Sequence, residues 1–426
     1  MRRRAYPRSL YTTRQLTRGA LRAHEALLAP PKRLLTALCV ASALAPLSAL
    51  ATPPAPAPQA APPTAERVAR LLRETPLTDG HNDLPWQLRK RARNQLSALN
   101  IAESTAPLKM HTDLARLKEG GVGAQFWSVY VPAGLTPSEA LQATLEQIDV
   151  VKRLARRFPE HLTFATTAAE ARAAHRAGRV ASLIGMEGGH SMAHSLGALR
   201  QLYDLGARYM TLTHTKTHLW ADSATDAPQH GGLSEFGEAV VREMNRLGMV
   251  VDLSHVSAET MRDALRVSRA PVLFTHSGAR AVCDHPRNVP DDVLDALKVN
   301  GGVVMVVFLP GYLRCGEGGA AVEGGATLED VLRHIDHIKA RIGVAHIGFG
   351  GDYDGMDDAP HGLEDVSKYP ALLAALLERG YSEEEVRGIM GENALRVLEG
   401  AEATARALAD ERPADLPPLH WVEPRP

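Results

Sequence analysis

A repeating unit dominates this sequence and restricts the fold more than any other feature. Eight times, a short apolar run rich in β-branched residues ends in polar residues or glycine and is followed by a segment with helical periodicity. Strands that alternate with helices pair in parallel through crossover connections. Eight such units in about 300 residues predict an α/β fold, the (β/α)8 barrel of the TIM type, with a doubly wound open sheet as the alternative. The predicted strands are residues 76–83, 122–131, 181–190, 207–215, 249–257, 271–278, 301–310 and 346–355.

Helical periodicity follows most of these strands and continues beyond the last of them. Several of the helical segments open with Ser, Thr or Asp and several close with Gly, which are common capping residues. We therefore predict one barrel domain at residues 66–400, followed by a Pro-rich tail at residues 401–426. The predicted helices are residues 138–158, 195–206, 234–248, 257–268, 290–299, 327–343, 372–380 and 382–400.

The N-terminal part of the chain does not belong to the predicted barrel. Basic residues precede the apolar run 34–51, which ends in ALA at residues 49–51, the small-x-small pattern of a signal cleavage site. We expect a signal peptide at residues 1–51, a Pro/Ala-rich linker at residues 52–65, and export to a periplasmic or secreted location. An uncleaved N-terminal segment that retains the protein at a membrane is the alternative, although Pro46 interrupts the apolar run.

The composition restricts the partners that this chain can have. The 426 residues carry a formal net charge of -1, with 45% apolar and 23% charged residues, as in ordinary globular proteins. This balance gives no support for a nucleic-acid partner or for electrostatic attachment to a membrane surface. Three cysteines are too few for a disulfide framework, and their spacing matches no zinc finger.

Side chains of the metal-ligand type gather at the carboxyl ends of the predicted strands. In a barrel these ends share one rim, where barrel enzymes place their active sites. His81 and Asp83 are two residues apart, so in an extended strand both point to the same side. A single histidine at a strand end is more often structural, but the convergence of several on one rim favours a site. The residues at the six strand ends are His81, Asp83, Glu187, His214, His255, His276, Asp352 and Asp354.

The donor atoms in this set favour zinc. Imidazoles and carboxylates without a suitably placed cysteine suit Zn²⁺, whereas Ca²⁺ and Mg²⁺ call for more oxygen ligands. Five ligands are too many for one catalytic zinc, and they predict two zinc ions per chain, about 3.5–4 Å apart, with Glu187 as the bridging carboxylate. A carboxylated Lys216 is the alternative bridge, in which case Glu187 is not a direct ligand. The five predicted ligands are His81, Asp83, Glu187, His255 and His276.

The other polar residues of the rim favour an amide substrate. A hydroxide held between two zinc ions attacks amides, esters or phosphoesters at neutral pH. We expect His214 to stabilise the oxyanion, Asp352 to carry a proton from water to the leaving amine, and Arg287 to bind a substrate carboxylate. The alternative for Arg287 is a surface residue paired with Asp291 or Asp292.

Long motifs follow one another along the chain: GHNDLPW, GVGAQFWSVY, GMEGGH, RYMTLTH, WADS, GLSEFGEAVVREMNRLGMVVDLSHVS, HSGARAVCDHPRNVPDDVL, GGDYDG and GLEDVSKYPALLAALLERGYSEEEV. In this order they resemble the membrane dipeptidase family, the M19 metallopeptidases, from about residue 77 to about residue 399. The resemblance implies a (β/α)8 barrel with two zinc ions that hydrolyses dipeptides, often with a D-residue at the C-terminal position. It also implies a homodimer.

The resemblance assigns roles to single residues as well. It implies a disulfide between Cys283 and Cys315, whereas Lys216 replaces a disulfide cysteine of the animal relatives. The segment 217–232 differs from the animal sequences, and we expect it to line the pocket. No hydrophobic C-terminal tail of the kind that directs a lipid anchor is expected. The implied metal ligands are His81, Asp83, Glu187, His255 and His276, and the implied substrate-contacting or catalytic residues are His214, Arg287, Tyr312 and Asp352.

Three functional hypotheses stay open at this point. The first is a two-zinc dipeptidase, and the second is another amide, lactone or β-lactam hydrolase that uses the same binuclear zinc site. The third is a barrel that has lost catalysis and serves as a binding protein. The complete ligand set together with Asp352 favours an active enzyme, because a degenerate descendant would usually have lost at least one of these residues.

Overall fold

The central sheet closes on itself to form a barrel. A computed structural model describes residues 62–316 and 325–419. Within these residues every pairing between neighbouring strands of the sheet is parallel, and β1 pairs with β2 and β9 while β2 also pairs with β4. The predicted (β/α)8 barrel is confirmed, and the open sheet is wrong. The strands are β1 (Leu77–Asn82), β2 (Val122–Ser128), β3 (Leu162–Phe164), β4 (Val180–Glu187), β5 (Ala207–Thr211), β6 (Val250–Asp252), β7 (Leu273–Ser277), β8 (Val303–Val306) and β9 (Ile347–Phe349).

All eight predicted strands are present, and each begins within two residues of its predicted start. Their carboxyl ends fall short of the prediction, most clearly at β9, which ends at Phe349 although the pattern predicts a strand to residue 355. The missing residues carry the polar side chains of the rim. They leave the extended conformation in order to turn over the mouth of the barrel.

The strand β3 is an addition that the sequence pattern did not predict. It pairs with Val180–Ser182 at the start of β4, while β5 pairs with Ile184–Glu187 farther along the same strand. Because β2 occupies the other edge of β4, β3 and β5 share one edge, and β3 lies outside the closed ring. A strand of three residues is too short to produce a recognisable alternation.

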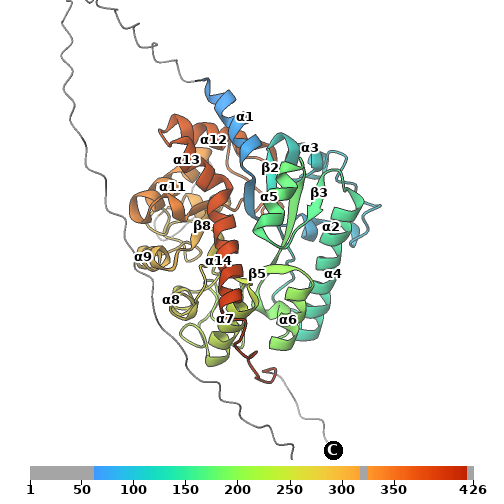
Figure 1. Cartoon of the computed structure of the whole chain (residues 1–426), viewed down its shortest axis with the longest axis vertical. Helices are drawn as coiled ribbons and strands as arrows, with labels where there is room; N and C mark the ends of the chain where they lie inside the picture. The colour runs from blue at the N-terminus through green and yellow to red at the C-terminus, as the bar shows by residue number, and fades with distance from the viewer. Residues whose placement is uncertain (1–61, 317–324, 420–426) are drawn as a thin grey trace, which may run out of the picture. The chain divides into compact units, whose positions relative to one another are not determined.

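The helices surround the barrel, as Figure 1 shows. The first helix begins at Thr64, inside the predicted linker, and the last continues to Ala407, beyond the predicted domain end at residue 400. The predicted signal peptide and most of the linker lie outside the described residues. In the described ranges, no helix has both the length and the apolar character needed to cross a membrane. The helices are α1 (Thr64–Glu74), α2 (Leu84–Ala92), α3 (Leu114–Glu119), α4 (Pro137–Arg157), α5 (Ala168–Arg176), α6 (Leu196–Asp204), α7 (Glu235–Leu247), α8 (Ala258–Val267), α9 (Asp291–Asn300), α10 (Pro310–Leu313), α11 (Leu328–Ile342), α12 (Tyr369–Glu378), α13 (Glu383–Arg387) and α14 (Asn393–Ala407).

The helix α14 closes the end of the barrel where the strands begin. It runs from the side of α13 toward α7 (Figure 1) and buries one apolar face. Gly400 permits a close approach, because a Cβ atom there would lie 2.4 Å from Pro271, just before β7. We call the resulting apolar contact the base cluster; its members include Leu395, Leu398 and Ala401 of α14 with Val250, Leu273, Val303 and Met305 of the strands.

Candidate metal centre and active site

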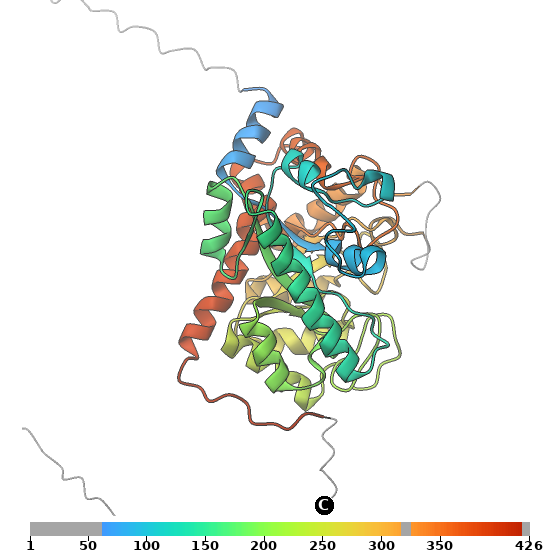
Figure 2. The same cartoon turned by 90° about the vertical axis from the view of Figure 1, so that its right-hand side faces the viewer.

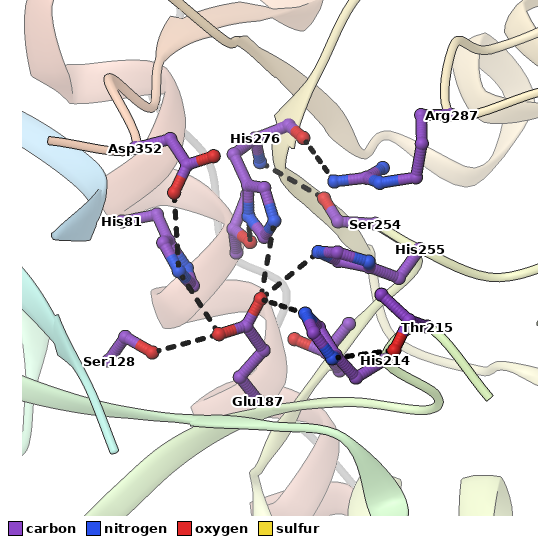
Figure 3. Close-up of polar contacts among 12 residues, drawn as sticks. His81, Ser128, Glu187, His214, Thr215, Ser254, His255, His276, Arg287 and Asp352 are labelled. Carbon is purple, nitrogen blue, oxygen red and sulfur yellow. Dashed lines mark hydrogen bonds and ion pairs between the residues drawn. The ribbon is translucent and has the colours of Figure 1, made fainter. Parts of the chain in front are cut away.

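The predicted metal ligands meet at the opposite, carboxyl end of the barrel (Figure 3). His81 lies in β1 and His276 in β7, Glu187 is the last residue of β4, and Asp83 and His255 follow β1 and β6 within three residues. The Nε2 atom of His81 is 3.2 Å from Oδ2 of Asp83. These side chains come from strands that are far apart in sequence, so closure of the barrel creates the cluster.

The carboxylate of Glu187 divides this cluster into two halves. Its Oε2 atom lies 3.5 Å from Nε2 of His81. Its Oε1 atom faces the other way, 3.0 Å from Nε2 of His255 and 3.6 Å from Nε2 of His276. Figure 3 shows the two oxygens turned toward different histidines. A carboxylate with one oxygen on each side has the geometry of a bridge between two cations.

The rings of His81 and His276 are fixed by hydrogen bonds behind them. The Tyr209 hydroxyl donates to the Gly80 carbonyl at 3.1 Å, so it accepts from Nδ1 of His81 at 2.9 Å. In the same way the Thr275 hydroxyl donates to Asp252 at 2.7 Å and accepts from Nδ1 of His276 at 2.9 Å. With the proton on Nδ1, both rings present the lone pair of Nε2 to Glu187, as metal ligands do.

Three buried atoms of the ligand cluster lack a hydrogen-bond partner in the described structure. Nε2 of His81, Nε2 of His276 and Oδ1 of Asp83 are buried and make no well-formed hydrogen bond within the described ranges. Buried polar atoms without a partner are costly unless a ligand satisfies them. Three overlapping groups of three ligand atoms could each hold one ion: His81, Glu187 and His276; Glu187, His214 and His255; and His81, Asp83 and Asp352. The residues therefore fit a metal ion, and their nitrogen and oxygen atoms fit zinc.

The charges of the site support this interpretation. Burial alone would raise the pKa of Glu187, but His81, His214 and a hydrogen bond with His255 outweigh it and hold the pKa well below its usual value. Burial, reinforced by other charges that include Arg287, lowers the pKa of His255 and His276 well below normal. Against the effect of burial, Tyr209, Glu187 and Asp83 raise the pKa of His81 well above normal. The ionised Glu187 and the neutral rings of His255 and His276 are thus in the protonation states in which such groups bind metals.

Asp352 has the opposite electrostatic character. It follows β9 by three residues, and its Oδ1 atom lies 4.0 Å from Nε2 of His81. Burial and the neighbouring carboxylates of Asp83 and Glu187 raise its pKa well above the usual value, against the effect of His81 and Arg287. A carboxyl group with a raised pKa beside the ligand cluster can hold a proton near neutral pH and release it to a partner.

Three residues of the same rim have strained backbone conformations. His255, Asp352 and Asp354 have φ angles of 69°, 59° and 66°, in the left-handed region that non-glycine residues rarely adopt. A reciprocal contact holds Asp354: its backbone N–H donates to Nδ1 of His111 at 2.9 Å, and its Oδ1 accepts from the N–H of His111 at 2.8 Å. We call this pair the His111–Asp354 clamp. The N–H of Asp352 also donates to the carbonyl of His81 at 3.1 Å.

Arg287 lies beside the metal cluster in the loop between β7 and α9. It is 1% exposed, and its guanidinium group donates to the carbonyl of His276 at 3.2 Å. Its Nε atom is buried without a hydrogen-bond partner, and it forms no ion pair within the described residues. The Cζ atom lies 5.2 Å from the ring centre of Tyr312. The interpretation of Arg287 as a surface residue is wrong, because Asp292 pairs with Arg262 instead.

A disulfide fixes the wall that carries Arg287 and Tyr312. Cys283 and Cys315 form this bond, with their Cα atoms 5.1 Å apart and 32 residues of separation in sequence, as the resemblance implied. Between them the side chain of Asn288 donates to the carbonyls of Cys283 and Tyr312, at 2.9 and 2.8 Å. The loop after β7 and the helix α10 are thereby held as one unit.

The last predicted rim residue, His214, lies on the other side of the cluster. Its Nε2 atom is 3.8 Å from Oε1 of Glu187, and burial lowers its pKa, so the ring is neutral. Its ring packs 4.9 Å from that of Tyr130, which in turn packs 4.9 Å from Trp86. Burial and the charges of Glu187 and Asp83 raise the pKa of Tyr130 to about 12.

Tyr130, Ser128 and His111 were not predicted as site residues. Ser128 donates to Oε2 of Glu187 at 3.2 Å. Ser128 and Tyr130 end the second predicted strand, so their place on the rim was a signal that the motif analysis did not use. His111 lies in a loop with no such signal.

Two details of the sequence interpretation need correction. Asp83 does not share a strand face with His81, because β1 ends at Asn82 and Asp83 has φ -94° and ψ 22° at the start of α2. A turn, not strand alternation, brings the two side chains together. Lys216 is not a bridge, because its side chain is 63% exposed and pairs with Asp226 at 3.7 Å.

A closed parallel barrel with four histidines and three carboxylates gathered on its carboxyl rim defines a metal-dependent hydrolase. Comparison with known sequences gives the family: the chain matches the membrane dipeptidase family, peptidase family M19, over residues 65–412. It belongs to this family and is a peptide-bond hydrolase with a metal cofactor.

Solved structures give the same assignment. A metallopeptidase from Rhodobacter sphaeroides, liganded with a phosphinate mimic of the dipeptide L-Ala-D-Ala, is 30% identical with a TM-score of 0.70, covering 77% of this chain and 99% of that one. Dipeptidase AC, a metallopeptidase of family M19, is 31% identical with a TM-score of 0.70 over the same shares. The probable dipeptidase PvdM from Pseudomonas aeruginosa, 22% identical with a TM-score of 0.72 over 80% of this chain and 99% of that one, shares the fold.

Proposed function

We propose that the protein is a zinc-dependent dipeptidase with two zinc ions per chain. His81 and Asp83 would hold one ion, His255 and His276 the other, and Glu187 both. The observation that carries this assignment is the carboxylate of Glu187, whose two oxygens face His81 on one side and His255 and His276 on the other. The exposed position of Lys216 removes the competing bridge.

When bound, the two zinc ions would supply a water acidic enough to attack at neutral pH and would polarise the scissile carbonyl. The chain's own residues supply the other steps. Asp352, whose raised pKa suits proton transfer, would take a proton and return it to the nitrogen of the leaving amine. The neutral ring of His214 would donate a hydrogen bond to the oxygen on which negative charge develops.

Arg287 supports a free dipeptide as the substrate. A buried guanidinium group with no acidic partner in the described chain needs an anion to complete its surroundings. The C-terminal carboxylate of a dipeptide, held beside Tyr312, would supply it with a planar, bidentate match. The ligand of the Rhodobacter sphaeroides relative mimics L-Ala-D-Ala, so we include L,D-dipeptides among the proposed substrates.

Two further parts of the proposal concern the setting of the enzyme. The Cys283–Cys315 disulfide suits an oxidising compartment, which supports export to a periplasmic or secreted location. We also propose a homodimer, which the measured mass in solution would test. Export would be tested by finding the N-terminus of the protein isolated from its source.

A turnover panel tests the function directly. The zinc-loaded enzyme is assayed on L,L- and L,D-dipeptides, the same dipeptides with an amidated C-terminus, an N-acyl amino acid, a lactone and a carbapenem. We expect free dipeptides to be hydrolysed fastest, and Arg287→Ala to raise KM for them while leaving the amidated forms nearly unchanged. Faster turnover of the lactone or the carbapenem than of the dipeptides would favour the alternative hydrolase over the proposed dipeptidase.

The variant Asp352→Asn separates catalysis from metal binding. It should keep close to two zinc ions per chain but lose roughly 10²–10⁴-fold in kcat. An undiminished kcat would remove Asp352 from the mechanism. A zinc content of one or none in the wild type would refute the bridged pair.

A further inference from the structure

Three surface grooves share lining residues and form a track beside α4. This long helix crosses the side of the barrel that faces the viewer in Figure 2. The first, of about 560 Å³, lies between the end of α4 and residues 94–97. The second, of about 630 Å³, lies between α4 and β3, and the third, of about 550 Å³, lies at the start of β2 and β4. Arg156 lines both the first and second grooves, and Arg179 lines both the second and third.

Cations outnumber acidic side chains along the track. Arg153 and Arg157 join Arg156 in the first groove, and Lys152 joins Arg156 and Arg179 in the second; neither groove contains an aspartate or a glutamate. The third groove adds Arg73, Lys118 and Arg176 and has one acidic residue, Glu160. Eight Lys and Arg side chains therefore line these three grooves with one carboxylate. A fourth groove, which shares Asn94 and Arg153 with the first, adds Arg93, Glu146 and Asp149.

Ion pairs neutralise few of these cations. Arg153 and Arg156 both approach Asp149, at 2.6 and 3.9 Å, and the other six form no ion pair within the described part of the chain. Burial and then the nearby charge of Arg156 lower the pKa of Lys152, as expected where like charges are crowded. The contrast with the remaining chain is large: after residue 51 it has 39 Lys and Arg against 48 Asp and Glu.

The shape of the track favours a linear partner. Its cations line grooves, so a flexible chain can reach them, whereas a flat bilayer would touch only the residues that project farthest. The exposed Pro159 shares the second groove with the cations and offers an apolar surface that suits the apolar face of a sugar ring.

A nucleic acid fits the track less well. Single strands bind through aromatic side chains on which the bases stack. The large exposed hydrophobic residues of the described chain include no aromatic residue. The two half-buried rings near the track already face cations, Phe164 with Lys152 at 5.3 Å and Phe158 with Arg157 at 5.6 Å.

We propose that this track binds a linear anionic glycan that carries sulfate or phosphate groups. Guanidinium groups bind such groups with paired hydrogen bonds, and arginine supplies six of the eight cations. The third groove includes Val122 and Val180, the first residues of β2 and β4, so the track reaches the end of the barrel opposite the rim that carries the metal cluster. A bound glycan would leave the active site open and would hold the enzyme on an anionic polymer while it works.

Heparin, a sulfated linear glycan, is the probe that tests the proposal. Its binding to the full chain is measured by titration calorimetry over a series of NaCl concentrations. The variant Arg156→Glu/Arg179→Glu changes the two junction residues of the track. The matched control, Lys298→Glu/Arg406→Glu, makes the same change of charge at exposed residues of α9 and α14 that form no ion pair in the described chain.

We expect the junction variant to bind heparin at least tenfold more weakly at 0.15 M NaCl, with the slope of log K against log salt reduced by about 2. The control should stay within twofold of the wild type. Dipeptide turnover should be unchanged in both variants, which also shows that they fold.

Three results would overturn the proposal. The junction variant could bind heparin as the wild type does, or the control could lose as much affinity as the junction variant. Tighter binding of an oligonucleotide or of anionic phospholipid vesicles than of heparin would assign the track to that other class of partner.

Discussion

The two ends of the barrel are built on opposite principles. At the base, Leu395, Leu398 and Ala401 of α14 pack against apolar side chains at the start of the strands, and these three residues are at most 1% exposed. At the rim, the buried Nε2 atoms of His81 and His276 have no well-formed hydrogen bond, and three residues take left-handed backbone angles. The base supplies packing, and the rim holds groups that would be costly without a ligand.

This difference shows how one fold carries both stability and chemistry. Unsatisfied polar atoms and strained residues cost of order 1–3 kcal/mol each. They persist only where the surrounding structure is stable enough to hold them, and here the apolar base is at the other end of the same strands. Changes at the base should therefore alter stability without altering the chemistry, and changes at the rim should do the reverse.

The largest effect is expected from Glu187→Gln at the rim. The amide keeps the size of the side chain but removes the charge that faces His81 on one side and His255 on the other. We expect zinc content to fall to one ion or fewer per chain and turnover to fall at least about 10³-fold. Metal analysis and steady-state kinetics on the same preparation measure both.

A matched control is Glu243→Gln, in α7. Glu243 is also buried but pairs with Arg200 and Arg246, at 3.0 and 2.8 Å, on the outside of the barrel. The Glu243→Gln substitution should lower the melting temperature and leave zinc content and turnover unchanged. If Glu187→Gln kept two zinc ions, the claim that rim residues control the chemistry while the base controls stability would be wrong.

The next effect is expected from Leu398→Ala at the base. Leu398 is fully buried in the base cluster, so the substitution leaves a cavity and should cost about 2–5 kcal/mol of the free energy of unfolding. Urea denaturation measures this cost, with the 90% exposed Val299→Ala as a control expected within about 0.5 kcal/mol of the wild type. The kcat of the folded variant should not change, and a large fall in kcat would show that the base also shapes the rim.

His334 lies near the rim, but its role is to stabilise the fold. Its Nδ1 accepts from the N–H of Ala279 at 2.8 Å and its Nε2 donates to the carbonyl of Leu313 at 3.0 Å. Burial lowers its pKa from 6.5 to about 4. The unfolded chain therefore binds this proton at higher pH than the folded chain does, and stability is lost as pH falls from about 6.5 to about 4.

The expected loss is about 3 kcal/mol over this range for the metal-free protein. In His334→Gln the stability curve should be flatter by that amount, because glutamine does not titrate. Equal slopes for wild type and His334→Gln would show that His334 does not stay neutral in the fold.

The smallest effect is expected at the His111–Asp354 clamp, which supports the strained backbone of Asp352. His111 is a positioning residue, and His111→Ala should lower kcat about tenfold with KM and zinc content unchanged. Asparagine places an oxygen where Nδ1 of His111 lies, so His111→Asn should restore most of kcat, whereas His111→Gln should not. A fall in zinc content in His111→Ala would instead make the clamp part of the metal site.

The sequence predicted the barrel because eight apolar runs of sufficient length recur with helical segments between them. It predicted that the candidate ligands would lie close together, because their side chains lie where those runs stop. It did not predict β3, because three residues are too few to show an alternation of apolar and polar side chains. It placed Asp83 wrongly, because the chain turns there and does not continue as a strand. The His111–Asp354 clamp joins residues 243 positions apart, and no local pattern in one sequence marks such a contact.

The disulfide between Cys283 and Cys315 has a practical consequence for anyone who prepares this enzyme. It holds the loop of Arg287 to the helix of Tyr312, and none of the metal ligands lies on either segment. Material produced in a reducing cytoplasm should therefore still bind metal and pass a metal assay, while the loop of Arg287 and the helix of Tyr312 are no longer held together. Free-thiol titration belongs beside metal analysis whenever KM values from different expression hosts are compared.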